Sequence, residues 1–213
     1  MSSRGSSLHS TSPVAALDVD GILTDFDTHW RQCAEHVLER PLPQVSHDHS
    51  MRVRYALTRK EYDAVWHVYH ADEWHRLPLY PHAADLVLAL EDLGCQVWAV
   101  TNVDPKHQSA RAESLHGLIP HGRIVCVGAL GNEGVTPYAA KKIVLQKLGA
   151  VAFLDDHPAN TNAALGVVSL SVLLDRGYHG LEAPEYGVTV IDDALDFPVL
   201  VEQLLKRTGR FVA

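Results

Sequence analysis

Short hydrophobic runs of strand length recur along the chain, and segments with helical spacing separate most of them. Most of these runs lack polar alternation, which is typical of strands covered on both faces, as in a parallel sheet. They lie at residues 14–19, 96–100, 123–127, 151–154, 167–174 and 188–191. Between two of them, Leu86, Leu90 and Leu93 share one helical face before Gly94, a helix-stop signal. The pattern predicts an α/β fold, a doubly wound parallel sheet whose ligands bind beyond the carboxyl ends of the strands.

One segment, residues 28–79, interrupts this alternation. It has no strand-like run, but it has helical stretches rich in His, Arg and aromatic residues, including Trp30, Trp66 and Trp74. We expect an inserted helical cap, whose tryptophans either form a small core or present rings to a ligand. Residues 14–27 and 80–213 then form the α/β core. Residues 1–13 are Ser-rich without an apolar core, and they are expected to be a disordered tail and no secretory signal.

Composition and charge narrow the class of protein. The 213 residues are 46% hydrophobic and 21% charged, as in an ordinary globular protein. Acidic residues outnumber basic ones by 26 to 18, so long nucleic acids are poor partner candidates. No apolar run approaches the ~20 residues that cross a bilayer, so we expect no membrane partner and a cytoplasmic protein. Cys33, Cys95 and Cys126 form no CxxC pair and are expected to be reduced, mostly buried thiols.

Two carboxylates stand where the first hydrophobic run ends. Asp18 and Asp20 are followed by Gly21, and residues i and i+2 of an extended segment point the same way. At an effective dielectric near 20, two carboxylates about 4 Å apart repel by about 4 kcal/mol. Such a pair therefore ordinarily has a cation or a proton between its members. The alternative is a pair of capping or turn aspartates.

A second acidic pair, Asp155 and Asp156, follows the run at residues 151–154. If both runs are strands of one parallel sheet, up to four carboxylates converge there. Such a site calls for a hard divalent cation with oxygen ligands, and Mg²⁺ is the natural choice. Alternatively the pair caps a helix at residues 160–165, although one cap needs only one carboxylate.

Uncharged donors and lysines add to the candidate site. A third run ends in Thr101 and Asn102, both able to donate hydrogen bonds to a phosphate, although a Thr-Asn turn is common for other reasons. Lys141 and Lys142 precede the second acidic pair. A lysine there could neutralise both the carboxylates and an incoming phosphoryl group, but surface lysines are ordinarily only solvated.

The order Asp-x-Asp-Gly, Thr-Asn, Lys and Asp-Asp resembles the haloacid dehalogenase superfamily of phosphohydrolases, most specifically in the string from Asp18 to Asp25. The resemblance implies a Rossmann-like sheet with a cap inserted after the first motif. Asp18 would be the nucleophile that forms an aspartyl-phosphate. Asp20 would be the general acid and base, and its backbone carbonyl would bind Mg²⁺. Thr101 would hold the phosphoryl group.

The same resemblance implies roles for the later motifs. Lys141 would steady the nucleophile and the phosphate, although the spacing alone does not choose between Lys141 and Lys142. Asp156 would be the direct metal ligand, because Asn160 then lies four residues later, where the family carries an Asp or Asn. Asp155 would be a second or indirect ligand. Substrate contacts are expected from Gly21, Phe26, Asn102, Lys142 and Asn160.

The predicted activity is that of a Mg²⁺-dependent phosphomonoester hydrolase acting on a small soluble phosphate ester. The dehalogenase branch lacks the second aspartate, so Asp20 favours phosphoryl chemistry over carbon–halogen cleavage. A phosphotransferase or mutase is the alternative within catalysis. A non-catalytic module that binds Mg²⁺ or a phosphometabolite is the alternative outside it, because a fold does not guarantee turnover.

The residues around Phe26 and residues 79–83 are similar to the five-prime deoxyribonucleotidase branch, in which an aromatic residue after the first motif packs on the base. Phe26 could take this role, with Trp66, Tyr69 or Trp74 closing from the cap. The alternative is that these rings only pack the cap against the core. A (deoxy)nucleotide is therefore one candidate substrate.

Several other polar residues attract notice. The histidines of the cap segment invite a transition-metal site, but no third ligand stands at a convincing spacing, and we expect them at the surface. His157 either tunes a leaving group or lines the entrance. Arg176 either meets a substrate anion or caps the sheet.

Overall fold

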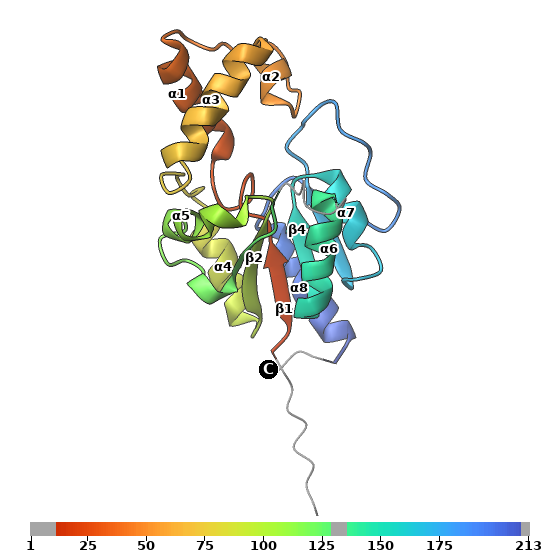
Figure 1. The fold of residues 1–213 in the computed structure, drawn as a ribbon. Coiled ribbons are helices and arrows are strands. Elements are labelled where there is room, and N and C mark those ends of the chain that lie inside the picture. The colour runs from red at the N-terminus through yellow and green to blue at the C-terminus, as the bar shows by residue number, and fades with distance from the viewer. Residues whose placement is uncertain (1–11, 129–135, 210–213) are drawn as a thin grey trace, which may run out of the picture.

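A parallel sheet of six strands forms the core of the computed structural model, which describes residues 12–128 and 136–209 (Figure 1). The strands are β1 (Val14–Leu17), β2 (Gln96–Thr101), β3 (Ile124–Cys126), β4 (Ala150–Asp155), β5 (Leu170–Leu174) and β6 (Thr189–Ile191). Their order is β3-β2-β1-β4-β5-β6, and every neighbouring pair is parallel. The α/β fold with a parallel sheet is thus confirmed.

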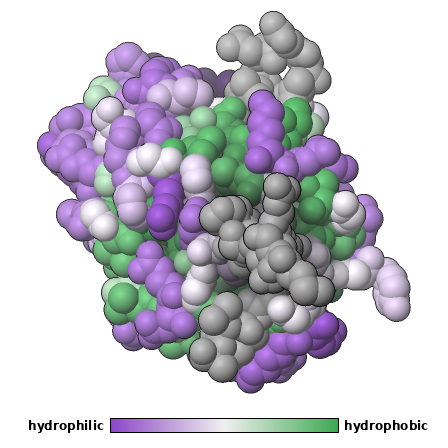
Figure 2. Space-filling view, turned by 90° about the horizontal axis from the view of Figure 1, so that it is seen from below, coloured by the Kyte–Doolittle hydropathy of each residue, from purple (hydrophilic) through white to green (hydrophobic). Residues whose placement is uncertain are grey.

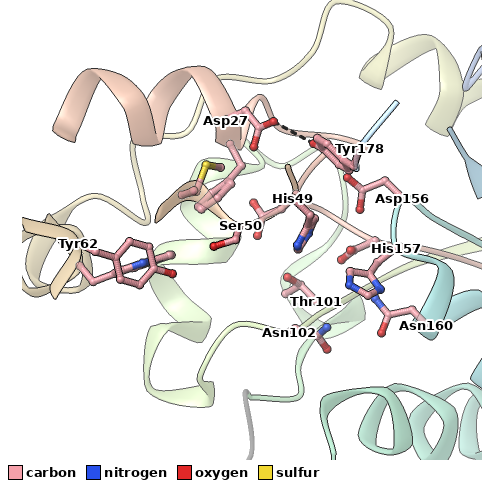
Figure 3. Close-up of a pocket in the computed structure, with 16 residues that line it drawn as sticks. Asp27, His49, Ser50, Tyr62, Thr101, Asn102, Asp156, His157, Asn160 and Tyr178 are labelled. Carbon is pink, nitrogen blue, oxygen red and sulfur yellow. Dashed lines mark hydrogen bonds between the residues drawn. The ribbon is translucent and has the colours of Figure 1, made fainter. Parts of the chain in front are cut away.

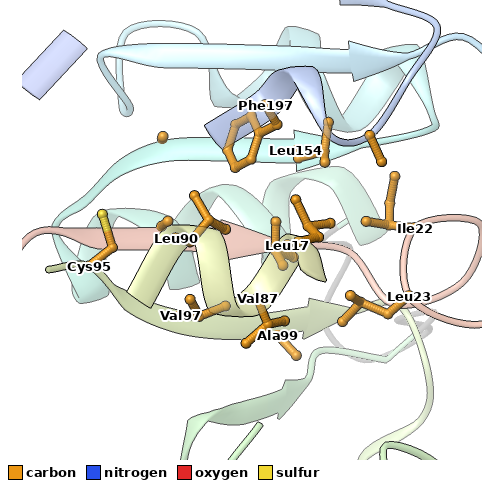
Figure 4. Close-up of a cluster of buried hydrophobic side chains, with 14 of the residues drawn as sticks. Leu17, Ile22, Leu23, Val87, Leu90, Cys95, Val97, Ala99, Leu154 and Phe197 are labelled. Carbon is orange, nitrogen blue, oxygen red and sulfur yellow. The ribbon is translucent and has the colours of Figure 1, made fainter. Parts of the chain in front are cut away.

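Helices cover both faces of the sheet because the strands are apolar on both sides. The helices of the core are α4 (Ala83–Asp92), α5 (Gln108–Ser114), α6 (Pro137–Leu148), α7 (Pro158–Ala164) and α8 (Asp196–Arg207). Ala15 and Leu17 pack in the cluster under α4 and α8, whereas Ala16 packs in the cluster under α6 and α7 (Figure 4). This alternation within β1 is the doubly wound arrangement that the hydrophobic runs predict.

Local sequence signals set the ends of several helices. The Thr136 hydroxyl caps α6 by accepting a hydrogen bond from the Ala139 N–H at 3.3 Å, and Gly149 ends the same helix with φ of +61°. The predicted helix at residues 160–165 is observed as α7, two residues earlier. Of the expected disordered tail, residues 1–11 lie outside the described residues.

The helical cap lies at the carboxyl end of β1 and contains α1 (Phe26–Leu38), α2 (Met51–Arg54) and α3 (Arg59–Asp72) (Figure 1). Its first helix begins at Phe26, two residues before the expected boundary at residue 28. The cap has its own hydrophobic core, in which Trp30 and Trp74 are buried. Two of the three tryptophans therefore pack the cap, and Trp66 is only partly buried.

The surface and the cysteines add little to the question of function. Seen from the end opposite the cap, hydrophilic side chains alternate with apolar patches (Figure 2). Among the described residues, no helix combines the length and the apolar character needed to span a membrane. Cys33, Cys95 and Cys126 are buried, free thiols.

Candidate active site

Three neighbouring strands bring the predicted site residues to one edge of the sheet. Asp18 follows β1, Thr101 ends β2 and Asp155 ends β4. The Asp18 N–H donates to the Leu154 carbonyl at 2.8 Å, which continues the pairing of β1 with β4 up to the site. A pocket of about 410 Å³ opens above these strand ends, between the core and the cap (Figure 3).

Residues of both the core and the cap line this pocket. The predicted site residues on its wall are Asp18, Asp20, Gly21, Phe26, Thr101, Asn102, Asp156 and Asn160. The residues that the sequence motifs do not indicate are Asp27, His49, Ser50, Met51, Tyr62 and Tyr178. Trp66 and His157 complete the wall.

Lys141 is the lysine that the structure brings to the acidic residues. Its Nζ lies 2.9 Å from Asp18 Oδ2 and 2.7 Å from Asp155 Oδ2, and its side chain is 1% exposed. Burial acts to lower the pKa of Lys141, but the charges of Asp155 and Asp18 outweigh it and raise this pKa. Lys142 is exposed and does not line the pocket, so of the two lysines it is Lys141 that contacts the acidic residues.

Asp155 is fully buried and contacts His157, Asn160 and Lys141. Its Oδ1 accepts hydrogen bonds from the His157 N–H at 2.8 Å and from Asn160 Nδ2 at 2.9 Å, while Oδ2 faces Lys141. Asn160 therefore contacts Asp155 directly and lines the pocket at the same time. The second acidic pair is built into the site and is not merely a helix cap, because it is the His157 side chain that caps α7.

Asp18, Asp155 and Asp156 form a group whose carboxylate oxygens can lie within 4.8 Å of one another. Burial and the charge of Asp155 raise the pKa of Asp18 from 3.8 to about 7, although Lys141 acts against this. Burial and the charges of Asp155 and Asp18 raise the pKa of Asp156 well above its usual range. Lys141 pairs with Asp18 and Asp155 but forms no ion pair with Asp156, and this group of carboxylates, with its all-oxygen donor set, fits a hard divalent cation such as Mg²⁺. Among the described residues, no other group of three His, Cys, Asp or Glu side chains converges in this way.

The turn after β1 brings Gly21 against Asp156. Gly21 has φ of +80°, and a Cβ at this position would lie 2.0 Å from Asp156 Oδ2, so only glycine fits. Arg176 donates to the Gly21 carbonyl, and its guanidinium lies 4.5 Å from the centre of the Tyr80 ring. Arg176 thus holds the turn by its backbone instead of pointing into the pocket.

Asp20 is held by two partners, one of which the sequence motifs do not indicate. Its Oδ1 accepts from the Thr24 hydroxyl at 3.1 Å, and its Oδ2 forms an ion pair with Arg111 of α5. Burial raises the pKa of Asp20, whereas Arg111 opposes this rise. The Arg111 side chain is fully buried, although arginine is seldom buried unless paired. No local signal in the sequence indicates it, because Asp20 is 91 residues away.

The cap gives the pocket an aromatic side and a polar side. Phe26, Tyr62 and Trp66 form the aromatic side, with Phe26 and Trp66 stacked 6.1 Å apart. Tyr69 and Trp74, which were candidates for closing over a ligand, do not line the pocket but pack against Phe26.

On the polar side, the Tyr178 hydroxyl donates to Asp27 Oδ2 at 2.9 Å (Figure 3). His157 lines the pocket there, and its ring meets that of His49 edge-on at 4.8 Å. Burial and the charge of Lys141 lower the pKa of His157 to about 4, so its imidazole is neutral at neutral pH.

No protein-family model matches the sequence, and no curated protein matches it. Solved structures match over nearly their whole length. A haloacid dehalogenase-family hydrolase from Deinococcus radiodurans with bound phosphate and sodium is 15% identical, with a TM-score of 0.59 over 94% of this chain and 98% of that one. This chain has the haloacid dehalogenase-like fold.

Other structures with this fold differ in their chemistry. A predicted phosphoglycolate phosphatase from Haemophilus somnus is 18% identical, with a TM-score of 0.59, and covers 89% of this chain and 98% of its own. An L-2-haloacid dehalogenase is 16% identical, with a TM-score of 0.56, and covers 90% and 100%. The haloacid dehalogenase-like fold alone therefore does not choose between phosphate release and dehalogenation.

Proposed function

We propose that this protein is a Mg²⁺-dependent phosphomonoester hydrolase that acts through an aspartyl-phosphate at Asp18. One observation carries the proposal: Asp18 and Asp20 line the same pocket, and Lys141 lies 2.9 Å from Asp18. A nucleophile, an acid and base, and a cation at the nucleophile are the protein groups that phosphoryl transfer through a carboxylate requires.

In the first step, a carboxylate oxygen of Asp18 attacks the phosphorus of the ester, and the bond from phosphorus to the leaving oxygen breaks. Asp20 gives its proton to that oxygen, so a neutral alcohol departs. The hydrogen bond from the Val19 N–H to Asp18 Oδ1, at 2.7 Å, and the Lys141 ammonium at Oδ2 orient the nucleophile. Thr101, which is buried and lines the pocket, would bind a phosphoryl oxygen.

In the second step, Asp20 removes a proton from water, and the water oxygen attacks the phosphorus of the aspartyl-phosphate. The bond between phosphorus and the Asp18 oxygen breaks, which releases inorganic phosphate and regenerates both carboxyl groups. Asp18, Asp156 and the backbone carbonyl of Asp20 would hold the metal ion, with Asp155 behind them. When bound, Mg²⁺ would neutralise charge on the phosphoryl oxygens.

Asp20 also bears on the choice between phosphatase and dehalogenase. Displacement of a halide needs no proton on the leaving group, whereas an alcohol leaving group does. A second carboxylate beside the nucleophile, and a cluster of acidic groups that fits a divalent cation, both support phosphoryl chemistry.

The residues of the pocket wall favour a substrate whose leaving group is uncharged and contains a flat ring. Among the described residues that line it, none is Lys or Arg, so a second anionic group on the substrate would have no cation to pair with. The rings of Phe26, Tyr62 and Trp66 offer a stacking surface, worth about 1–3 kcal/mol for one base. A nucleoside monophosphate meets both conditions, whereas phosphoglycolate, with its carboxylate, does not.

The reaction class is tested by phosphate release from a panel of monoesters, with Mg²⁺ or with EDTA, and with Asp18→Asn as the blank. Release that requires Mg²⁺ and Asp18 is the expected result. Halide release from an L-2-haloacid in the same assay would instead identify a dehalogenase. A folded protein that releases neither would point to a binding module or to a transferase that needs an alcohol acceptor.

The substrate class is tested within the same panel by comparing deoxynucleoside monophosphates, sugar phosphates and phosphoglycolate. We expect nucleotides to have the highest kcat/KM and phosphoglycolate the lowest. Phe26→Leu keeps an apolar side chain but removes the ring, so it should lower kcat/KM for nucleotides about tenfold and hardly change that for sugar phosphates. Equal losses for both classes would contradict stacking on Phe26.

A further inference from the structure

Arg111 is the most unusual charged residue outside the motifs. Its side chain has no exposed surface, and its Nη2 donates to Asp20 Oδ2. Within the described part of the chain, its Nε and Nη1 are buried and donate to no acceptor. A buried cation with two unused donors is costly, so stability alone does not explain its presence.

The helix that carries Arg111 is fixed to the core. The Gln108 side chain donates to the Ile124 carbonyl and accepts from the Cys126 N–H at 3.0 Å, which ties the start of α5 to β3. The Ser114 hydroxyl donates to the Arg111 carbonyl at 2.8 Å. Arg111 therefore extends to Asp20 from a rigid base.

Arg111 also meets the cap. Its guanidinium carbon lies 5.0 Å from the centre of the Trp74 ring, and Trp74 is buried in the core of the cap. This ring covers the guanidinium and limits where it can move. Arg111 is thus held between the Asp20 carboxylate and a cap ring.

Together, Arg111 and Thr24 determine the orientation of the Asp20 carboxylate. Thr24 bonds to Oδ1 and Arg111 to Oδ2, so each oxygen has one protein partner and keeps another lone pair. Asp20 still lines the pocket in this orientation. A proton donor held in this way loses little freedom when the substrate binds, and such preorganisation lowers the barrier to proton transfer.

We propose that Arg111 is the positioning residue that holds the Asp20 carboxylate toward the leaving-group oxygen. This proposal rests on the proposed function, in which Asp20 is the general acid. Arg111 contacts neither the substrate nor the phosphoryl group; it acts through Asp20. Replacing Arg111 should therefore lower kcat/KM most for those esters whose leaving group needs a proton.

Two aromatic phosphate esters, 4-nitrophenyl phosphate and benzyl phosphate, differ in whether their leaving group needs a proton. The phenolate that leaves 4-nitrophenyl phosphate requires no proton, whereas the alkoxide of benzyl phosphate does. Arg111→Met should lower kcat/KM for benzyl phosphate about 100-fold and that for 4-nitrophenyl phosphate less than about threefold. Arg111→Lys should recover part of the loss, and Arg40→Met, which breaks the exposed Arg40–Glu61 pair, should change neither value.

A double-mutant cycle separates action through Asp20 from a general structural role. In the Asp20→Asn background, Arg111→Met should cause no further loss for benzyl phosphate. Equal losses for the two esters, or a further loss in that background, would overturn the proposal. If Arg111→Met does not fold, Arg111→Lys replaces it, and equal losses for the two esters are again the overturning result.

Failure of the proposed function gives a different result. In that case the wild-type protein releases phosphate from neither ester. Crystal structures of the wild type and of Arg111→Met then test the role of Arg111. A rotated or disordered Asp20 carboxylate in the variant would support positioning by Arg111. An unchanged Asp20 would overturn it.

Discussion

Burial and like charge act together at Asp18. The residue is 7% exposed and lies beside the buried Asp155, and this environment raises its pKa to about 7 even though Lys141 is 2.9 Å away. The same environment that makes the carboxylate costly makes it a good ligand for a cation, because a metal ion removes the repulsion. Stability and metal binding at this residue are therefore linked to pH.

The first prediction concerns the stability of the metal-free protein. Folded Asp18 keeps its proton up to about pH 7, whereas in the unfolded chain it loses it near 3.8. The stability from this group is present below pH 3.8 and is lost as the pH rises through 7. Relative to the wild type, Asp18→Asn should gain about 1–3 kcal/mol in the free energy of unfolding between about pH 5 and about pH 8. Urea unfolding in EDTA measures it, and a pH-independent difference would contradict it.

The second prediction concerns Mg²⁺ binding. Because the metal needs ionised carboxylates, it must displace the protons that Asp18 and Asp156 hold. The affinity for Mg²⁺ should therefore rise with pH up to about 7, and binding below that pH should release protons. Calorimetry in buffers of different ionisation enthalpy measures both effects. Binding without proton release below pH 7 would show that Asp18 is already ionised.

The sequence indicates those residues of the site that stand at strand ends. Asp18, Thr101 and Asp155 could be predicted because parallel strands place their carboxyl ends together. Arg111 could not, because its partner Asp20 is 91 residues away and nothing in the α5 segment requires a buried arginine. Lys141 and Lys142 could not be told apart by spacing, because only the packing of α6 against β4 decides which of them is buried.

At the scale of elements, the turn between β1 and α1 is the most constrained segment. The Val19 carbonyl accepts hydrogen bonds from the backbone of Ile22, Leu23 and Thr24, which closes the turn tightly. Gly21 of this turn lies close to Asp156, so the segment after β1 and the segment after β4 meet here. The shape of the turn thus controls where Asp18 and Asp156, the proposed metal ligands, lie.

The third prediction tests this turn with two glycine variants. Both Gly21→Ala and Gly149→Ala place a Cβ at positive φ, which costs about 1–2 kcal/mol of stability. Only at Gly21 does the Cβ meet Asp156 Oδ2, at 2.0 Å, whereas nothing lies within 4 Å of it at Gly149. Gly21→Ala should therefore also weaken Mg²⁺ binding by about 10–100-fold, and Gly149→Ala should not. Equal metal affinities in the two variants would show that Asp156 is not a ligand.

The strands and the cap were more predictable than the pocket wall. The six hydrophobic runs correspond to the six strands, and the signal is strongest for the central strand β4, which is buried at every position, whereas the edge strand β6 exposes Val190. Asp27, His49 and Tyr178 come from a helix start and two loops, and only tertiary packing brings them together. Polar residues of loops carry no periodicity, so no pattern could assign them to one pocket.

At the scale of the whole molecule, a core loop pairs with the cap across the pocket. The His179 N–H donates to the His47 carbonyl at 2.8 Å, and the His49 N–H donates to the His179 carbonyl at 3.0 Å. Beside this short pairing, Tyr178 bonds to Asp27 and lies against the Arg54 guanidinium, 4.8 Å from its ring centre. These contacts between the loop and the cap add to the two covalent connections that join the cap to the core.

The fourth prediction tests this pairing with two variants of the same loop. Gly177 and Gly180 both have positive φ, so alanine strains the backbone at either position. At Gly180 the Cβ would also lie 2.7 Å from Asp48 Oδ2, in the paired segment of the cap, whereas at Gly177 it meets nothing within 4 Å. Gly180→Ala should therefore speed hydrogen exchange at the His49 and His179 amides several-fold more than Gly177→Ala does.

Exchange at these two amides reports the pairing directly, because each N–H donates across the boundary between core and cap. Amides within β1 and β4 serve as the internal control, since a general loss of stability would accelerate them as well. If the two glycine variants exchange alike, the space between Gly180 and Asp48 does not control the stability of this pairing. If only Gly180→Ala opens the pairing, this loop stabilises the position of the cap over the pocket, in addition to the contact between Arg111 and Trp74.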